Sequence, residues 1–272
     1  MKVKAYAKLN LNLHLLPNKL ANGLYPVKFI NCQINLFDIL EIKKGKEFPL
    51  EEDNLIHKAA KLLGVGAEVK LHKNIPMLGG LAGGSSDGAE ALKALIKLYK
   101  LKVNDTQLNE YADKLGKDVC YCVKGGLCEV GGDGTKIKKL SYKLPRLYLT
   151  IIYPKDIKPS TGYMYQSLDK NKIGLNLDKY KKLKKAIKNA PPAGGKSEII
   201  KNLFNDFEEL AINLFPEILK IKNDLKISGA ENSMLLGSGL GVAGFFENKK
   251  NRDKSFEMLK KKYKIIFGTE TV

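Results

Sequence analysis

Residues 76–92 read PMLGGLAGGSSDGAEAL, a glycine-rich loop that runs directly into an apolar helical pattern. The loop contains four glycines: Gly79, Gly80, Gly83 and Gly84. Glycine can adopt positive φ and lets a ligand approach the backbone closely. The first N–H groups of a helix lack partners within the helix, and the helix dipole adds positive potential there. The stretch therefore predicts a cradle for an anionic phosphate, with Ser85 and Ser86 available to a phosphate oxygen or to Mg²⁺.

The loop matches neither of the two commonest nucleotide-binding patterns. It contains no G-x-x-x-x-G-K-[ST], and no G-x-G-x-x-G with an acidic residue at ribose distance. Residues 195–197 (GKS) resemble the end of the first pattern, but the glycine required five residues earlier is Ala190, so we reject that match. A flexible linker is the plain alternative for the loop, and the apolar helix that starts at once argues against it.

Composition indicates a soluble protein with small-molecule ligands. The chain has 272 residues, a net charge of +18 and no apolar run as long as a membrane span or signal peptide, so we expect a cytoplasmic location and no membrane partner. Arg146 and Arg252 are the only arginines, whereas readout of nucleic acids favours arginine over lysine, so we expect no nucleic-acid partner. Free buried thiols, rather than a metal site, are expected at Cys32, Cys120, Cys122 and Cys128.

Hydrophobic periodicity predicts mixed strands and helices. Strands are expected at 3–16, 29–42, 67–73, 147–153 and 242–247. Candidate N-caps for three helices are Asp53 or Asn54, Ser85 or Ser86, and Thr106. Further helices are expected at 176–190, 197–214, 216–226 and within 254–268, with a flexible joint at 190–195. The absence of strict βαβ order favours an α+β fold, with a lobe boundary near residue 147.

The loop resembles the ATP loop of the GHMP kinases, which include galactokinase, homoserine kinase and mevalonate kinase. Within that superfamily it is most similar to kinases that act on a cytidine-diphosphate methylerythritol, whose pattern is P-x-G-x-G-L-G-G-G-S-S-D-A-A. Leu78, Ala82 and Gly88 depart from that pattern. Three further segments match family motifs in the same order along the chain: 7–11 (AKLNL), 116–119 (GKDV) and 236–239 (LGSG). Residues 159–162 (PSTG) and 205–208 (NDFE) also resemble family stretches.

This resemblance implies a two-lobed GHMP kinase fold. Residues 1–146 would form an N-terminal ATP-binding lobe that resembles ribosomal protein S5. Residues 147–272 would form a C-terminal α/β sandwich lobe, with the substrate cleft between the two. The implied reaction phosphorylates a hydroxyl of the cytidine-diphosphate methylerythritol, a middle step of non-mevalonate isoprenoid precursor synthesis.

The resemblance also implies roles for individual residues. Asp118 matches the catalytic aspartate that accepts the hydroxyl proton, and Lys8 matches the lysine that keeps this aspartate ionised. ATP with Mg²⁺ is the implied cofactor, and the expected ATP-binding residues are Asn54, Pro76, Met77, Leu78, Gly79, Gly80, Leu81, Ala82, Gly83, Gly84, Ser85 and Ser86. The expected substrate-binding residues are Asn10, Tyr25, Tyr165, Gly237 and Ser238. A helix-end carboxylate, a solvated lysine and half-buried aromatic packing are the structural alternatives for these roles.

The acceptor side departs most from the family pattern. Leu24 and Tyr25 stand where these kinases carry Tyr-His, and Asp133 stands where a basic residue is frequent. A GHMP kinase for another small alcohol, such as a mevalonate or homoserine, therefore stays open as an alternative. The third hypothesis is a member of the superfamily that is catalytically idle or binds nucleic acid, which the net charge of +18 suggests. The expected assembly is a monomer or a weak homodimer.

Overall fold

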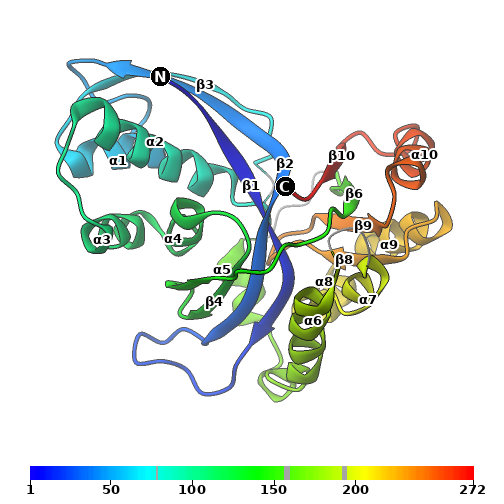
Figure 1. Cartoon of the computed structure of the whole chain (residues 1–272). Coiled ribbons are helices and arrows are strands. Elements are labelled where there is room, and N and C mark those ends of the chain that lie inside the picture. Colours follow the sequence, from blue (N-terminus) through cyan, green and yellow to red (C-terminus); the bar gives the residue numbers. More distant parts are fainter. Residues whose placement is uncertain (78, 156–159, 192–194) are drawn as a thin grey trace.

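The computed structural model describes residues 1–272 except residue 78, residues 156–159 and residues 192–194 (Figure 1). Leu78 of the expected ATP loop, part of the segment 159–162 and part of the joint at 190–195 thus lie outside the described residues. The described residues form two β-sheets, and helices pack against each of them. The predicted α+β class is confirmed.

The first sheet is built on two long antiparallel strands, β1 (Lys2–Leu15) and β2 (Val27–Lys44). Its other strands are β3 (Ala67–His72) and β4 (Cys128–Gly132), which both pair with β2, β5 (Lys136–Lys139), which pairs with β4, and β7 (Phe204–Asn205), which lies parallel to β1. Strand β1 sends Ala7, Leu9 and Leu11 into a core shared with the second sheet. Because side chains alternate along a strand, Lys8 and Asn10 project from the opposite face.

Helices α1 to α4 lie on that opposite face of the β1–β2 pair (Figure 1). They are α1 (Leu55–Leu63), α2 (Gly83–Tyr99), α3 (Asp105–Leu115) and α4 (Lys117–Lys124). Ala91, Leu92 and Leu95 form a stripe on one side of α2 because of their helical spacing. They are fully buried, and α2 packs against β1 and β2. Burial of this stripe holds the N-terminal end of α2, and the loop before it, against β1.

Two of the expected helix starts were wrong, and one was right. Helix α1 is capped by Asn54, whose Oδ1 accepts a hydrogen bond from the Ile56 amide, as predicted. Helix α2 begins at Gly83 after Ala82 and has no side-chain cap, so neither serine caps it. Helix α3 is capped by Asn104, since Asn104 and Gln107 form a reciprocal capping box, and Thr106 lies inside the helix.

The second sheet is antiparallel throughout and has the order β10-β6-β9-β8. Its strands are β6 (Tyr148–Ile152), β8 (Asn232–Leu235), β9 (Val242–Phe246) and β10 (Ile266–Glu270). Helices α9 (Glu217–Ile227) and α10 (Lys249–Leu259) pack on this sheet. The other helices of this half are α5 (Thr161–Gln166), α6 (Leu177–Asn189), α7 (Lys196–Lys201), α8 (Glu208–Leu214) and the 3₁₀ turn Lys170–Lys172. The expected helix at 197–214 is wrong, because β7 interrupts it to pair with β1.

The two sheets are joined by more than chain connectivity. Strand β7 comes from the second half of the chain and completes the first sheet, and Thr271 bridges to Ile34 of β2. The lobe boundary between residues 146 and 147 stays a prediction. Among the described residues, no helix combines the length and apolar character that crossing a bilayer requires.

Candidate active site

A cavity of about 1010 Å³ lies where the glycine loop, β1, β2 and the N-terminal ends of α2 and α4 converge. Residues from the second half of the chain close it, from α5 and from the turn after β8. Most of the expected site residues line it: Lys8, Asn10, Tyr25, Asn54, Pro76, Met77, Gly79, Gly80, Ala82, Gly83, Gly84, Ser85, Asp118, Tyr165, Gly237 and Ser238. Leu81 and Ser86 are buried beside the cavity and are not part of its lining.

The glycine loop presents backbone to the cavity in a left-handed conformation. Gly79 and Gly80 have φ of 85° and 87°, as predicted. Gly83 and Gly84 were expected to share this conformation but form the first turn of α2, and Ala82 has the positive φ of 54° in their place. Because no side chain caps α2, its first amide groups remain available at the cavity wall. Together with the helix dipole they make this end of the cavity favourable for anions.

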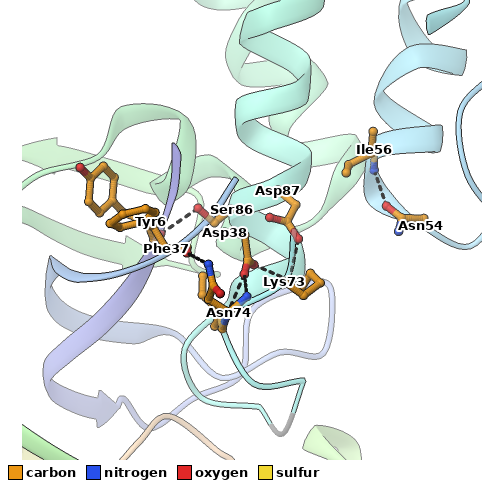
Figure 2. Close-up of polar contacts among 10 residues, drawn as sticks. Tyr6, Phe37, Asp38, Asn54, Ile56, Lys73, Asn74, Ser86 and Asp87 are labelled. Carbon is orange, nitrogen blue, oxygen red and sulfur yellow. Dashed lines mark hydrogen bonds and ion pairs between the residues drawn. The ribbon is translucent and has the colours of Figure 1, made fainter. Parts of the chain in front are cut away.

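Hydrogen bonds from distant strands hold the loop in place. The Lys8 amide of β1 donates to the Leu81 carbonyl at 2.9 Å, and the Tyr153 hydroxyl after β6 donates to the Gly79 carbonyl at 2.9 Å. The Ser86 hydroxyl donates to the Tyr6 carbonyl of β1 at 2.8 Å (Figure 2), so it stabilises the start of α2 rather than facing the cavity.

The turn after β8 packs directly on the loop. A Cβ atom built on Gly80 would lie only 2.4 Å from the Leu236 carbonyl oxygen, and one on Gly237 would lie 3.0 Å from the Gly80 Cα. Asn205 of β7 fixes the turn from behind, since its Nδ2 donates to the Leu235 and Gly237 carbonyls at 2.8 and 2.7 Å. Residues 79–80, 205 and 235–237, far apart in the sequence, thus form one wall.

A cluster that the sequence patterns did not reveal links the two ends of the loop. Figure 2 shows Lys73 between Asp38 of β2 and Asp87 of α2, with Nζ–carboxylate distances of 2.5 and 2.7 Å. Asp38 also accepts hydrogen bonds from the Asn74 and Ile75 amides at 2.5 and 2.8 Å. The cluster therefore fixes the residues that enter the loop and the helix that leaves it.

The charges of this cluster are unequal, because one ammonium group faces two buried carboxylates. Burial raises the pKa of Asp87 to about 7 in spite of its hydrogen bond to Lys73. Burial opposes protonation of Lys73, but hydrogen bonds to Asp38 and Asp87 outweigh it and raise the pKa of the lysine. In the sequence, Lys73 stands three residues before Pro76 and Asp87 follows Ser86, so the two residues lie at the two ends of the glycine-rich loop.

Lys8 and Asp118 meet at the cavity, although 110 residues separate them in the chain. Lys8 Nζ lies 3.1 Å from Asp118 Oδ1, and the exposed fractions of the two side chains are 6% and 50%. The lysine is therefore fixed in the protein wall, whereas the carboxylate is open to a ligand. Asp118 sits in the first turn of α4, a helix that the sequence patterns did not predict.

Aromatic residues also line the cavity. Tyr165 of α5 is held edge-on against Phe207 with ring centroids 4.9 Å apart, and burial raises the pKa of its hydroxyl to about 12. The ammonium group of Lys19 lies over the ring of Tyr25, 5.1 Å from its centroid. Leu24 is exposed and lines the cavity beside Tyr25.

Asp133 does not act as an isolated charge in this region. It forms an ion pair of 2.9 Å with Lys117, which also pairs with Asp113 at 2.7 Å. The hydrogen bond from Lys117 and a second from Thr135 lower the pKa of Asp133 to about 2. Lys117 precedes Asp118 directly, so these pairs anchor the first turn of α4.

Relatives and solved structures match this chain from end to end. The model of the GHMP kinases N terminal domain matches residues 54–127. The 4-diphosphocytidyl-2-C-methyl-D-erythritol kinase of Caldicellulosiruptor bescii is 36% identical over 100% of this chain and 98% of its own length. The same kinase of Clostridium novyi is 35% identical over the whole of both chains. The chain belongs to the 4-diphosphocytidyl-2-C-methyl-D-erythritol kinase family.

Structural comparison agrees with this family. A crystal structure of 4-(cytidine 5'-diphospho)-2C-methyl-D-erythritol kinase superposes with a TM-score of 0.84 and 25% identity, covering 100% of this chain and 99% of that one. Homoserine kinase from Cytophaga hutchinsonii superposes with a TM-score of 0.71 at 18% identity, over 99% and 93% of the two chains, and shares the fold. The two-lobed GHMP kinase fold implied by the sequence resemblance is therefore confirmed.

Proposed function

We propose that this chain transfers the γ-phosphoryl group of ATP to a hydroxyl of 4-diphosphocytidyl-2-C-methyl-D-erythritol. The observation that carries the proposal is the Lys8–Asp118 pair, which shares one cavity with the glycine loop and the uncapped start of α2. A phosphate-binding end and an acid–base pair in one cavity suit phosphoryl transfer, because that chemistry needs positioning and charge stabilisation more than covalent catalysis. The family relatives carry the name of this reaction.

The ATP end is formed by the loop and α2. The amides of Gly83, Gly84 and Ser85 in the first turn of α2 would donate to phosphate oxygens, as helix N-termini do. The Ser85 hydroxyl, which lines the cavity, would meet a phosphate oxygen or the Mg²⁺ ion that accompanies ATP as part of the substrate. Asn54 lines the same end from α1, where its Oδ1 is already engaged as a helix cap.

In the reaction, an acceptor hydroxyl oxygen forms a bond to the γ-phosphorus while the bond from phosphorus to the β–γ bridging oxygen breaks and ADP leaves. Asp118 accepts the hydroxyl proton, since its carboxylate is the open member of the pair. Lys8 keeps Asp118 oriented through the 3.1 Å contact and places positive charge beside the phosphoryl group in transit.

The acceptor end takes the nucleotide portion of the second substrate. Tyr25 and Tyr165 both line the cavity, and a cytosine would stack on one of them, as bases stack on aromatic side chains elsewhere. The Lys19 ammonium lies over the Tyr25 ring, so positive charge is close to the expected diphosphate. Gly237 and Ser238 also line the cavity, and the Ser238 hydroxyl is 3.3 Å from that of Thr161 in α5, the helix that carries Tyr165.

The test is an ADP-release assay with 4-diphosphocytidyl-2-C-methyl-D-erythritol, mevalonate and homoserine as acceptors. We expect turnover with the cytidyl substrate, and a loss of at least about 100-fold in kcat for Asp118→Asn while ATP still binds. Turnover with mevalonate or homoserine and none with the cytidyl substrate would refute the proposed acceptor. Near-normal turnover in Asp118→Asn would refute the proposed base.

A further inference from the structure

Two buried asparagines face each other across the central strands at the cavity wall. Asn10 of β1 and Asn31 of β2 are register partners, and Asn10 Nδ2 donates to Asn31 Oδ1 at 2.7 Å. Their exposed fractions are 3% and 1%, and both line the cavity. Asn10 follows Lys8 by two positions and therefore projects from the same strand face.

This amide pair is incompletely satisfied. Among the described residues, Asn10 Oδ1 has no hydrogen-bond partner although it is buried, and Asn31 Nδ2 donates no hydrogen bond. Buried polar groups without partners cost free energy, and native proteins keep few of them. The neighbouring Asn12, by contrast, uses both atoms of its amide. Its Oδ1 accepts a hydrogen bond from the Ile30 amide at 2.8 Å, and its Nδ2 donates to the Lys28 carbonyl at 3.0 Å.

The unused atoms define what the pair can bind. They offer one acceptor and one donor, and exchanging O and N in both amides leaves the same combination. A hydroxyl both donates and accepts, so one hydroxyl or two adjacent ones satisfy both atoms. A carboxylate has no proton for the free amide oxygen, so an acid at this point would be disfavoured.

We infer that Asn31, together with Asn10, is a specificity-determining residue that binds a hydroxyl of the acceptor next to Lys8 and Asp118. The inference rests on the proposed function and extends it, because it assigns this part of the cavity to the neutral polyol portion of the acceptor. Asn12 supports the arrangement from behind, since its bonds to residues 28 and 30 hold β2 at the position of Asn31.

The test compares Asn31→Leu with Asn35→Leu, a control at an exposed residue of the same strand. The acceptors are 4-diphosphocytidyl-2-C-methyl-D-erythritol and analogues that each lack one hydroxyl of its methylerythritol portion. For Asn31→Leu we expect the KM for the intact acceptor to rise by about 10- to 100-fold, as for a lost buried hydrogen bond, with the KM for ATP nearly unchanged. Asn35→Leu should leave both constants unchanged.

The analogues separate binding from structural damage. The wild type should discriminate against at least one deoxy analogue, and Asn31→Leu should lose that discrimination. Asn31→Asp keeps the acceptor atom for Asn10 and should show the same loss, which covers the case in which the leucine variant does not fold. A wild type active on the intact acceptor, with discrimination retained in the Asn31 variants, overturns the inference. A wild type inactive on that acceptor refutes the proposed function instead.

Discussion

Substitution of Gly80 by alanine tests whether the glycine loop and the turn after β8 form one wall. Gly80 has φ of 87°, which costs an L-residue about 1–2 kcal/mol. Its new Cβ would lie 2.4 Å from the Leu236 carbonyl oxygen, so the loop or the turn must move. Overpacking of this kind costs about 1–3 kcal/mol. We therefore expect Gly80→Ala to lower the free energy of unfolding by about 2–5 kcal/mol.

Gly64→Ala isolates the conformational part of that cost. Gly64 ends α1 with φ of 66°, and a Cβ there would meet no atom within 4 Å. Urea unfolding should therefore place Gly64→Ala about 1–2 kcal/mol below the wild type, and Gly80→Ala clearly lower still. In the ADP-release assay, Gly80→Ala should also raise the KM for ATP. Equal stability of the two variants would refute the contact between loop and turn.

Two further predictions concern the cluster that holds the loop. Lys73→Met leaves Asp38 and Asp87 without their shared cation and should lower the free energy of unfolding by about 3–5 kcal/mol. The control Lys70→Met, at an exposed lysine of β3, should change it by less than about 0.5 kcal/mol. Asp87 has a pKa of about 7 when folded and 3.8 ordinarily, so its stabilising contribution is full below about pH 4 and is lost as the pH rises through about 7. The decline in the wild type should reach about 1.4 kcal/mol per pH unit, and Asp87→Asn should lack it. Equal pH slopes of the unfolding free energy in the wild type and in Asp87→Asn would contradict the raised pKa.

The elements that the sequence predicted well are those with a strong local pattern. The two long strands, α1 with its Asn54 cap and β6 all follow from alternation or capping chemistry. The break at β7 could not be predicted locally, because Asn205 satisfies carbonyl groups of residues 235 and 237. The cap of α3 could have been predicted from the sequence, since Asn104 and Gln107 have capping-box spacing. The prediction of Thr106 as the N-cap was wrong.

The site divides in the same way. The loop and the Lys8–Asp118 pair were found because short segments of the chain resemble family motifs. Asp38 was not found, because an aspartate within a strand pattern gives no sign that it will accept two amides and an ammonium group. Asn31 was not found either, since its significance depends on the register of β1 and β2, which places it opposite Asn10.

Lys8 has two attachments that serve different parts of the cavity. Its backbone amide holds the glycine loop through Leu81, and its ammonium group holds the carboxylate of Asp118. Both attachments belong to one residue, so a change in the position of the loop at Leu81 acts on the backbone of the residue whose ammonium group contacts the proton acceptor. We therefore expect a compound that displaces Leu81 to affect proton removal by Asp118 as well as ATP binding, because Lys8 contacts both Leu81 and Asp118.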